Sequence, residues 1–118
     1  MRGAMAVVAL VAFAGNVAAA ESPDDPRVIV VERLRYVFDA QCVQLGSRVG
    51  DVPLDAIEVI GEDRAEDGAP VEIVFDLGEV TCEGRNFTGS PFCTGSRCSV
   101  VRYELKRRRY RQVEQWME

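Results

Sequence analysis

Four cysteines are the residues of this chain whose chemistry is easiest to interpret: Cys42, Cys82, Cys93 and Cys98. Four thiols can form two disulfides, or they can hold a zinc ion as thiolates. The chain lacks the paired C-x2-C spacing of a four-thiolate zinc site, so we expect disulfides. The four residues between Cys93 and Cys98 are long enough to close a small ring. We predict Cys93 paired with Cys98 and Cys42 with Cys82, while the other two pairings stay open.

Residues 63–71 have the outline of a calcium-binding loop. Asp63 and Asp67 stand at its first and fifth positions, and Gly68 stands at the sixth, where such loops turn sharply. Calcium needs six to eight oxygen ligands, but Ala65 and Val71 occupy the third and ninth positions. We therefore expect a solvated acidic turn, and we keep a degenerate calcium-binding module as an alternative.

The residue types also limit catalysis. The chain has no histidine, which excludes Ser-His-Asp and Cys-His sites. Carboxylates such as Asp63, Glu66, Asp67 and Glu72 are plentiful, but they form no organised constellation in the sequence. The sequence predicts a protein that is not an enzyme and that has no catalytic residue, no cofactor and no metal site.

Charge is unevenly distributed along the chain, whose net charge is −5. Residues 51–83 contain eleven acids and one base, Arg64, whereas the residues from Arg97 onward contain seven bases and three acids. We expect the basic end to lie beside the acidic middle in neighbouring strands, where opposite charges attract. The alternative is that residues 106–109 are a docking patch for an anionic partner. A nucleic-acid partner is not expected, because the chain as a whole is acidic.

The first twenty residues have the pattern of a secretory signal peptide. Arg2 precedes an apolar run over residues 4–13, and three alanines end at Ala20, where we place the cleavage site. Gly15 and Asn16 interrupt the run, which disfavours an uncleaved membrane anchor. We expect one domain over residues 21–118 with no membrane span after cleavage, in the periplasm or secreted, where thiols oxidise to disulfides.

The elements that position these residues are predicted from apolar periodicity. Apolar residues at three- and four-residue steps predict a helix over residues 26–45, capped by Asp24 or Asp25 and ended by Gly46. A short strand over residues 28–31 is the rival interpretation, because that run is β-branched. Strands are predicted at residues 56–60, 71–77, 101–105 and 110–116, with loops at 62–70 and 78–96 and a charged turn at 107–109. The predicted fold is α+β, with the N-terminal helix packed on an antiparallel meander of about four strands.

The chain resembles a group of small, largely uncharacterised exported proteins of Gram-negative bacteria. In that group a helix with one cysteine leads to an aspartate-rich turn of the form D-x-N-x-D-G-x-P-D, then to a strand, a cysteine and a segment like C-G-x-G-G-C. The matching stretches here are residues 63–71, residues 71–77, Cys82 and residues 92–98. The resemblance implies the fold, export and disulfides, and it implies no activity.

These observations predict a non-catalytic exported protein that binds a protein or a component of the cell envelope. A second hypothesis is an inhibitor of a secreted hydrolase such as a lysozyme or protease, because rigid crosslinked loops lose little entropy on docking. Its contact surface would be residues 83–97, with Phe87 and Phe92 as anchors. We expect these two rings to fill the core instead.

Overall fold

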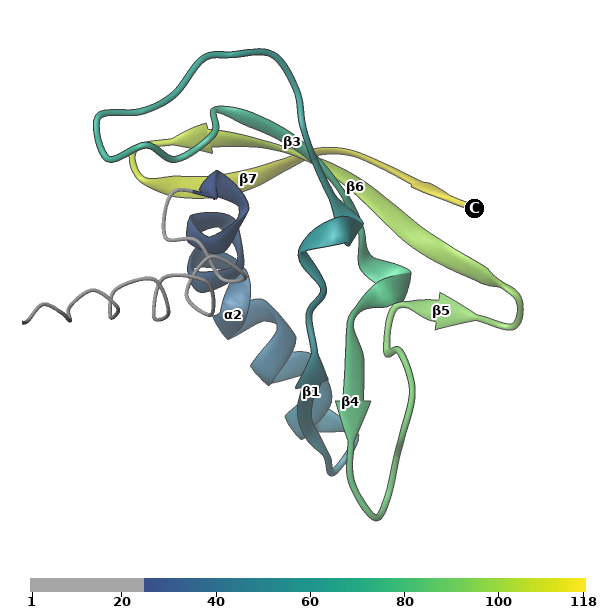
Figure 1. Ribbon diagram of the computed structural model, residues 1–118. Coiled ribbons are helices and arrows are strands. Elements are labelled where there is room, and N and C mark those ends of the chain that lie inside the picture. Colours follow the sequence, from purple (N-terminus) through teal and green to yellow (C-terminus); the bar gives the residue numbers. More distant parts are fainter. Residues whose placement is uncertain (1–24) are drawn as a thin grey trace, which may run out of the picture.

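The computed structural model describes residues 25–118, and the predicted signal peptide lies outside them. Residues 25–118 fold into one α-helix, α2, and seven strands that form two antiparallel sheets (Figure 1). The α+β class is confirmed, and so are the disulfides Cys42–Cys82 and Cys93–Cys98. No helix among residues 25–118 is long and apolar enough to cross a membrane.

Helix α2 spans Pro26–Gln44, as the apolar spacing predicts, and the rival strand at its start is wrong. The Asp25 side chain accepts a hydrogen bond from the Arg27 backbone N–H at 3.0 Å, which caps the first turn. At the other end Gly46 has a φ of 77°, and the N–H groups of Gly46 and Ser47 donate to the carbonyls of Val43 and Cys42. This pair of bonds is a Schellman motif, in which glycine removes the strain of the left-handed residue.

The larger sheet has the order β2-β3-β6-β7, and all four strands are antiparallel. Their bounds are Ile57–Val59, Glu72–Asp76, Arg97–Lys106 and Arg109–Met117. A short strand β5, Cys93–Thr94, pairs with the start of β6. The meander of four strands is therefore confirmed, although β6 begins four residues before the predicted strand.

A second, two-stranded sheet was not predicted. It pairs β1 (Arg48–Asp51) with β4 (Thr81–Glu83), and Cys82 on β4 is bonded to Cys42 on α2. Residues 78–96, predicted as a loop, thus contain β4 and β5. Three-residue 3-10 helices, η1 (Leu54–Ala56) and η2 (Leu77–Glu79), lead into β2 and β4.

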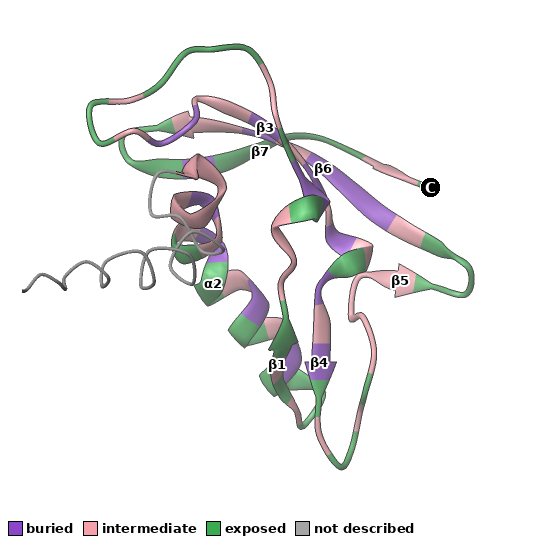
Figure 2. Ribbon diagram, in the orientation of Figure 1, coloured by how far each residue is buried: buried purple, intermediate pink, exposed green. Residues whose placement is uncertain are grey.

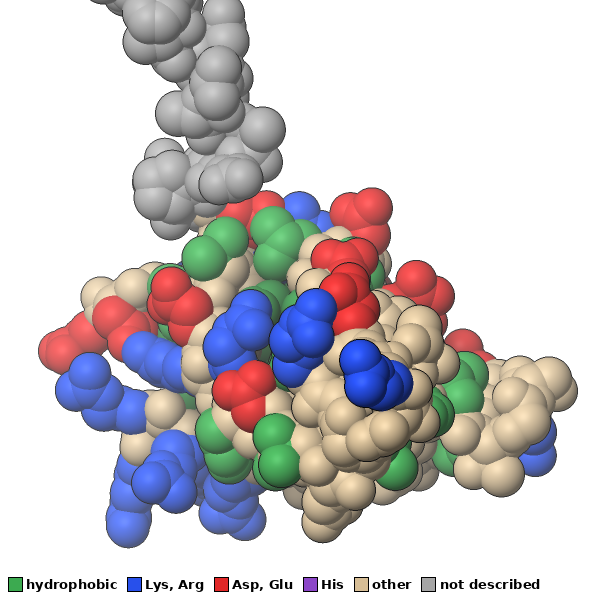
Figure 3. Space-filling view, turned by 90° about the horizontal axis from the view of Figure 1, so that it is seen from below, with side chains coloured by type: hydrophobic (Ala, Val, Ile, Leu, Met, Phe, Trp, Pro, Cys, Tyr) green, Lys and Arg blue, Asp and Glu red, His purple; other side chains and the backbone are tan. Residues whose placement is uncertain are grey.

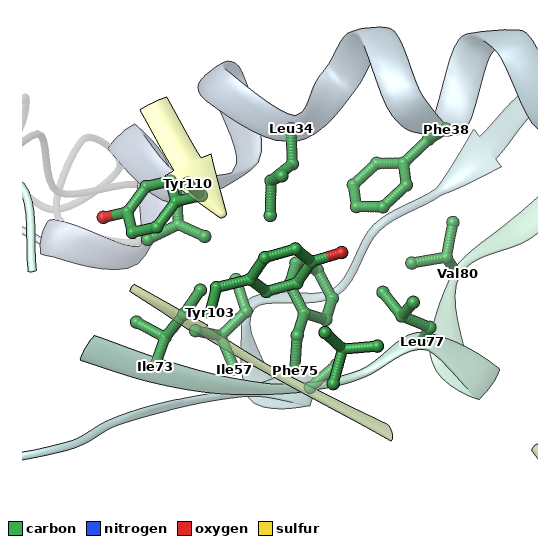
Figure 4. Close-up of a cluster of buried hydrophobic side chains, with 12 residues drawn as sticks. Leu34, Phe38, Ile57, Ile73, Phe75, Leu77, Val80, Tyr103 and Tyr110 are labelled. Carbon is green, nitrogen blue, oxygen red and sulfur yellow. The ribbon is translucent and has the colours of Figure 1, made fainter. Parts of the chain in front are cut away.

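The core lies between α2 and one face of the larger sheet (Figures 2 and 4). Val30, Leu34 and Phe38 project from the helix at four-residue steps, and all three are almost fully buried. Ile73 and Phe75 on β3 meet them from the sheet, as the two-residue alternation of that strand predicts. The Phe38 ring packs edge-to-face against Phe75, with centroids 5.5 Å apart.

Candidate binding site at the basic hairpin

The turn between β6 and β7 has an unusual backbone for its sequence. Lys106 pairs with Arg109, so the loop consists of Arg107 and Arg108 alone. Their φ angles are 53° and 72°, which is the pattern of a type I′ turn. Asparagine and glycine normally fill these two positions, and a left-handed conformation costs other residues about 1 kcal/mol or more each. The turn therefore carries strain that its sequence does not relieve.

The same turn is strongly basic. We use the name basic tip for five exposed side chains: Lys106, Arg107, Arg108, Arg109 and Arg111. Within residues 25–118, no salt bridge joins any of them to a carboxylate. Four of the five line an open hollow of about 390 Å³, and Figure 3 shows basic side chains gathered at one end of the molecule. The basic tip thus presents unneutralised positive charge on an acidic chain.

A groove lies on the helix side of this turn. We use the name arginine groove for a hollow of about 290 Å³ lined by Arg33, Tyr36, Arg108, Arg109 and Tyr110. Helix α2 supplies Arg33 and Tyr36, and the hairpin supplies the other three. A smaller hollow of about 220 Å³ adjoins it, because Arg33 and Arg108 line both. Its other walls are Leu105 and residues 65–67, which belong to the loop of residues 63–71 that we name the acidic loop.

Arg33 links the helix to the acidic loop. Its Nη2 donates to the Oδ2 of Asp67, and the Oδ1 of Asp67 accepts from the Ala69 backbone N–H at 3.1 Å. The hydrogen bond from Arg33, followed by the bond from Ala69, lowers the pKa of Asp67 below its ordinary value of 3.8. The Nη1 of Arg33 is buried and has no hydrogen-bond partner among the described residues. A buried guanidinium nitrogen without an acceptor is rare, because it loses its hydration without replacement.

Tyr110 forms a fixed wall of the arginine groove. Its hydroxyl donates to the Pro70 carbonyl at 2.6 Å, which ties β7 to the acidic loop. Burial of the ring raises the pKa of Tyr110 to about 12, so the hydroxyl remains a donor well into the alkaline range. Tyr36 on the opposite wall is exposed and leaves an aromatic ring free to contact a ligand.

The acidic loop does not have the geometry of a calcium site. Backbone hydrogen bonds from Ala65 to Ala69 and from Val71 to Asp63 hold it as a narrow turn. Asp67 is directed to Arg33, and no cluster of three or more possible metal-ligating side chains was found among residues 25–118. The loop gives no support to the calcium alternative.

The predicted pairing of acidic and basic strands holds for one arginine and fails for the tip. Arg102 on β6 lies between Glu72 on β3, at 2.8 Å, and Glu114 on β7, at 3.2 Å. Strand neighbours therefore neutralise the middle of β6. The basic tip extends beyond the start of β3, because Glu104 is the last residue of β6 that pairs with β3, and its partner is Glu72.

All four cysteines lie in disulfides and are thus structural residues. Cys93 and Cys98 face each other directly across the β5–β6 pair, and Gly95 in the loop between them has a φ of 64°. Of the two aromatic residues in the segment that would contact a hydrolase, Phe92 packs edge-to-face on Phe38 and belongs to the core, as predicted. Phe87 is half-buried and lies outside the main cluster.

Sequence reasoning identified the basic run but missed Arg33 and Tyr36. Both side chains lie on the helix about seventy residues before the turn, and only the fold brings them together. No protein-family model, curated protein or solved structure matches this chain. The resemblance to small exported proteins therefore stays a prediction.

Proposed function

We propose that this chain is a non-catalytic exported protein that binds an anionic component of the cell envelope through its basic tip. The observation that carries the proposal is the turn of Arg107 and Arg108, in which backbone strain and unneutralised positive charge coincide. Strain that a fold retains at an exposed turn commonly serves function, because a relaxed turn of the same length is available.

Export is supported by three features. Residues 1–20 have the pattern of a signal peptide, and the chain forms two disulfides, which persist in oxidising compartments. The resemblance to small exported proteins points the same way. The absence of histidine from the sequence supports a role in binding and not in catalysis.

An anionic envelope surface suits the basic tip better than a protein partner does. Protein interfaces are usually centred on desolvated aromatic or apolar anchors, whereas the five side chains of the tip are all charged. Flexible cations around a two-residue turn match the closely spaced phosphates of a lipid surface, where each base contributes about 1 kcal/mol of binding. The overall negative charge is a weak obstacle, because it is screened within about 8 Å at physiological salt.

The test is binding to lipid vesicles. Cosedimentation of the chain over residues 21–118 would be compared on phosphatidylcholine vesicles and on vesicles that also contain phosphatidylglycerol. We expect binding to the anionic vesicles only, and we expect salt to weaken it. The triple variant Lys106→Gln, Arg107→Asn and Arg111→Gln should lose about 3 kcal/mol, on the order of a hundredfold in partitioning.

The matched control is Arg35→Gln, Arg48→Gln and Arg85→Gln, which removes three exposed arginines at other places on the surface. It changes net charge equally and should bind far more tightly than the tip variant. Equal loss in both variants, or equal binding to neutral vesicles, would refute the proposal. Capture of an acidic protein by the unmodified tip, without vesicle binding, would assign the tip to a protein partner instead.

A further inference from the structure

We infer that the arginine groove is a binding site for a single phosphate-type oxyanion, held between Arg33 of α2 and Arg108 of the hairpin turn. The inference deepens the proposed function and rests on it for the biological source of the ligand, a lipid headgroup or a free phosphate. It adds a site formed between the helix and the hairpin, whereas the hollow at the basic tip is lined by hairpin residues alone.

Arg33 is prepared to bind an acceptor. Asp67 holds its Nη2, so the guanidinium is fixed in position, while the Nη1 remains buried without a partner. Leaving such a donor unsatisfied is unfavourable unless an acceptor completes it. Arg33 lines the groove with a side chain that is 21% exposed, so an oxyanion there can accept a charge-assisted bond from it.

Arg108 approaches the groove from the other side. Arg108 is the second residue of the turn and has a left-handed backbone conformation. It lines both hollows together with Arg33. The two guanidinium groups come from different elements. A tetrahedral phosphate presents oxygens in more directions than a planar carboxylate does, so it fits donors that come from two walls.

The surroundings favour an anion with a small organic group. Arg109 adds a third positive charge, and the exposed ring of Tyr36 offers a flat apolar wall. The only carboxylates among the residues lining the two hollows are Glu66 and Asp67, and Arg33 already engages the second of these. Positive charge therefore predominates in the larger hollow.

The experiment is a titration of the chain over residues 21–118 with inorganic phosphate at constant ionic strength, with chloride as the reference anion. Two-dimensional ¹H–¹⁵N spectra would follow the Nε–Hε resonances of the arginines. We expect saturable shifts at Arg33 and Arg108 with phosphate. Shifts of equal size with chloride, or shifts at neither arginine, would overturn the inference.

Two variants make the test specific. Arg108→Gly relaxes the turn and keeps the fold, and it should weaken phosphate binding about tenfold or more, because it removes one charge-assisted bond. Arg85→Gln removes an exposed guanidinium that lines none of these hollows and should leave the phosphate affinity within about twofold. Similar affinities for these two variants would show that no specific pocket exists.

The failure of this inference can be distinguished from failure of the proposed function. Vesicle binding without phosphate shifts at Arg33 and Arg108 would leave the proposed function standing and remove the pocket. Phosphate binding that depends on Arg108, without vesicle binding, would retain the pocket and identify the ligand as a free phosphate compound. Binding of both would identify a phospholipid headgroup if Arg108→Gly weakens vesicle binding more than Arg107→Asn does, because each variant removes one charge of the basic tip but only Arg108 lines the groove.

Discussion

Lys106 at the end of β6 lies directly opposite Arg109 at the start of β7, so two like charges close the hairpin. Opposed like charges destabilise an antiparallel pair, and the left-handed Arg107 and Arg108 between them add strain. Asparagine and glycine would fit the same turn without either cost. The hairpin end is thus poorly suited to folding stability and well suited to contact with negative charge.

The first prediction follows from this strain. The double variant Arg107→Asn and Arg108→Gly should raise the free energy of unfolding by about 1 to 2 kcal/mol, because both residues then fit the turn. For a domain of this size each kcal/mol raises the melting temperature by about 4 to 8 °C, which calorimetry can measure. The control Arg35→Gln and Arg85→Gln removes the same charge elsewhere and should change stability by less than about 0.5 kcal/mol. An unchanged melting temperature of the turn variant would show that the arginines are not strained.

The sequence predicted those elements whose periodicity is long enough to detect. Nineteen residues of α2 carry a buried residue every fourth position, and β3 alternates buried and half-buried residues. Strands β1 and β4 contain only four and three residues, so they have no periodicity of their own. Their pairing joins residues that are thirty or more positions apart in the chain, and the Cys42–Cys82 disulfide ties β4 to α2.

For the same reason, only part of the candidate site could be predicted from the sequence. Four consecutive bases are visible in the sequence, but the turn conformation and the partner wall are not. Arg33 lies one position before the buried Leu34 on an otherwise ordinary helix, and its missing acceptor is a property of three-dimensional packing. An arginine beside a core position is too common to have indicated a site.

The second prediction separates core residues from surface residues in the segment after β4. Phe92→Ala should lower the free energy of unfolding by about 2 to 3 kcal/mol, because the ring packs on Phe38. Phe87→Ala should cost less, about 1 kcal/mol, because the ring lies outside the main cluster. Urea denaturation of both variants measures the difference. Equal costs would mean that Phe87 is also a core residue, and the inhibitor hypothesis would lose its last aromatic anchor.

The third prediction concerns alkaline pH. Burial raises the pKa of Tyr103 and of Tyr110 to about 12, from an ordinary value of 10.0. Between about pH 10 and pH 12 the unfolded chain therefore loses phenol protons that the folded chain keeps, so stability is complete below pH 10 and falls through this window. Each tyrosine contributes about 2 to 3 kcal/mol to that fall.

Tyr103→Phe is the cleaner variant for this test, since Tyr110→Phe also removes the hydrogen bond to Pro70. Stability measured by urea denaturation at several pH values should fall less steeply above pH 10 in Tyr103→Phe than in the parent chain. Parallel curves would show that the Tyr103 hydroxyl is hydrated in the folded state.

The fourth prediction concerns acid. The hydrogen bond from Arg33 lowers the pKa of Asp67 below 3.8, so at low pH the unfolded chain binds a proton that the folded chain does not. The stability from this carboxylate is present above pH 3.8 and is lost as pH falls below that value. Asp67→Asn should therefore flatten the acid limb of the stability curve. Asp63→Asn in the same loop is the control and should leave the loss of stability at low pH nearly unchanged. Equal flattening of the curve by both variants would show that the effect does not depend on Arg33.

The last prediction ranks the two disulfides. Cys42–Cys82 closes 40 residues and Cys93–Cys98 closes 5, so the loop-entropy model assigns about 4 and about 2 kcal/mol to them. The long bridge also joins α2 to β4 through two fully buried side chains, so its removal opens a cavity in addition. Cys42→Ala with Cys82→Ala should thus destabilise the chain more than Cys93→Ala with Cys98→Ala, as measured by urea denaturation.

The hairpin register of β5 and β6 keeps Cys93 and Cys98 opposite each other without the bond, so the variant Cys93→Ala with Cys98→Ala should still fold. The reverse ranking would mean that the short bridge, and not the link between helix and sheet, maintains this fold.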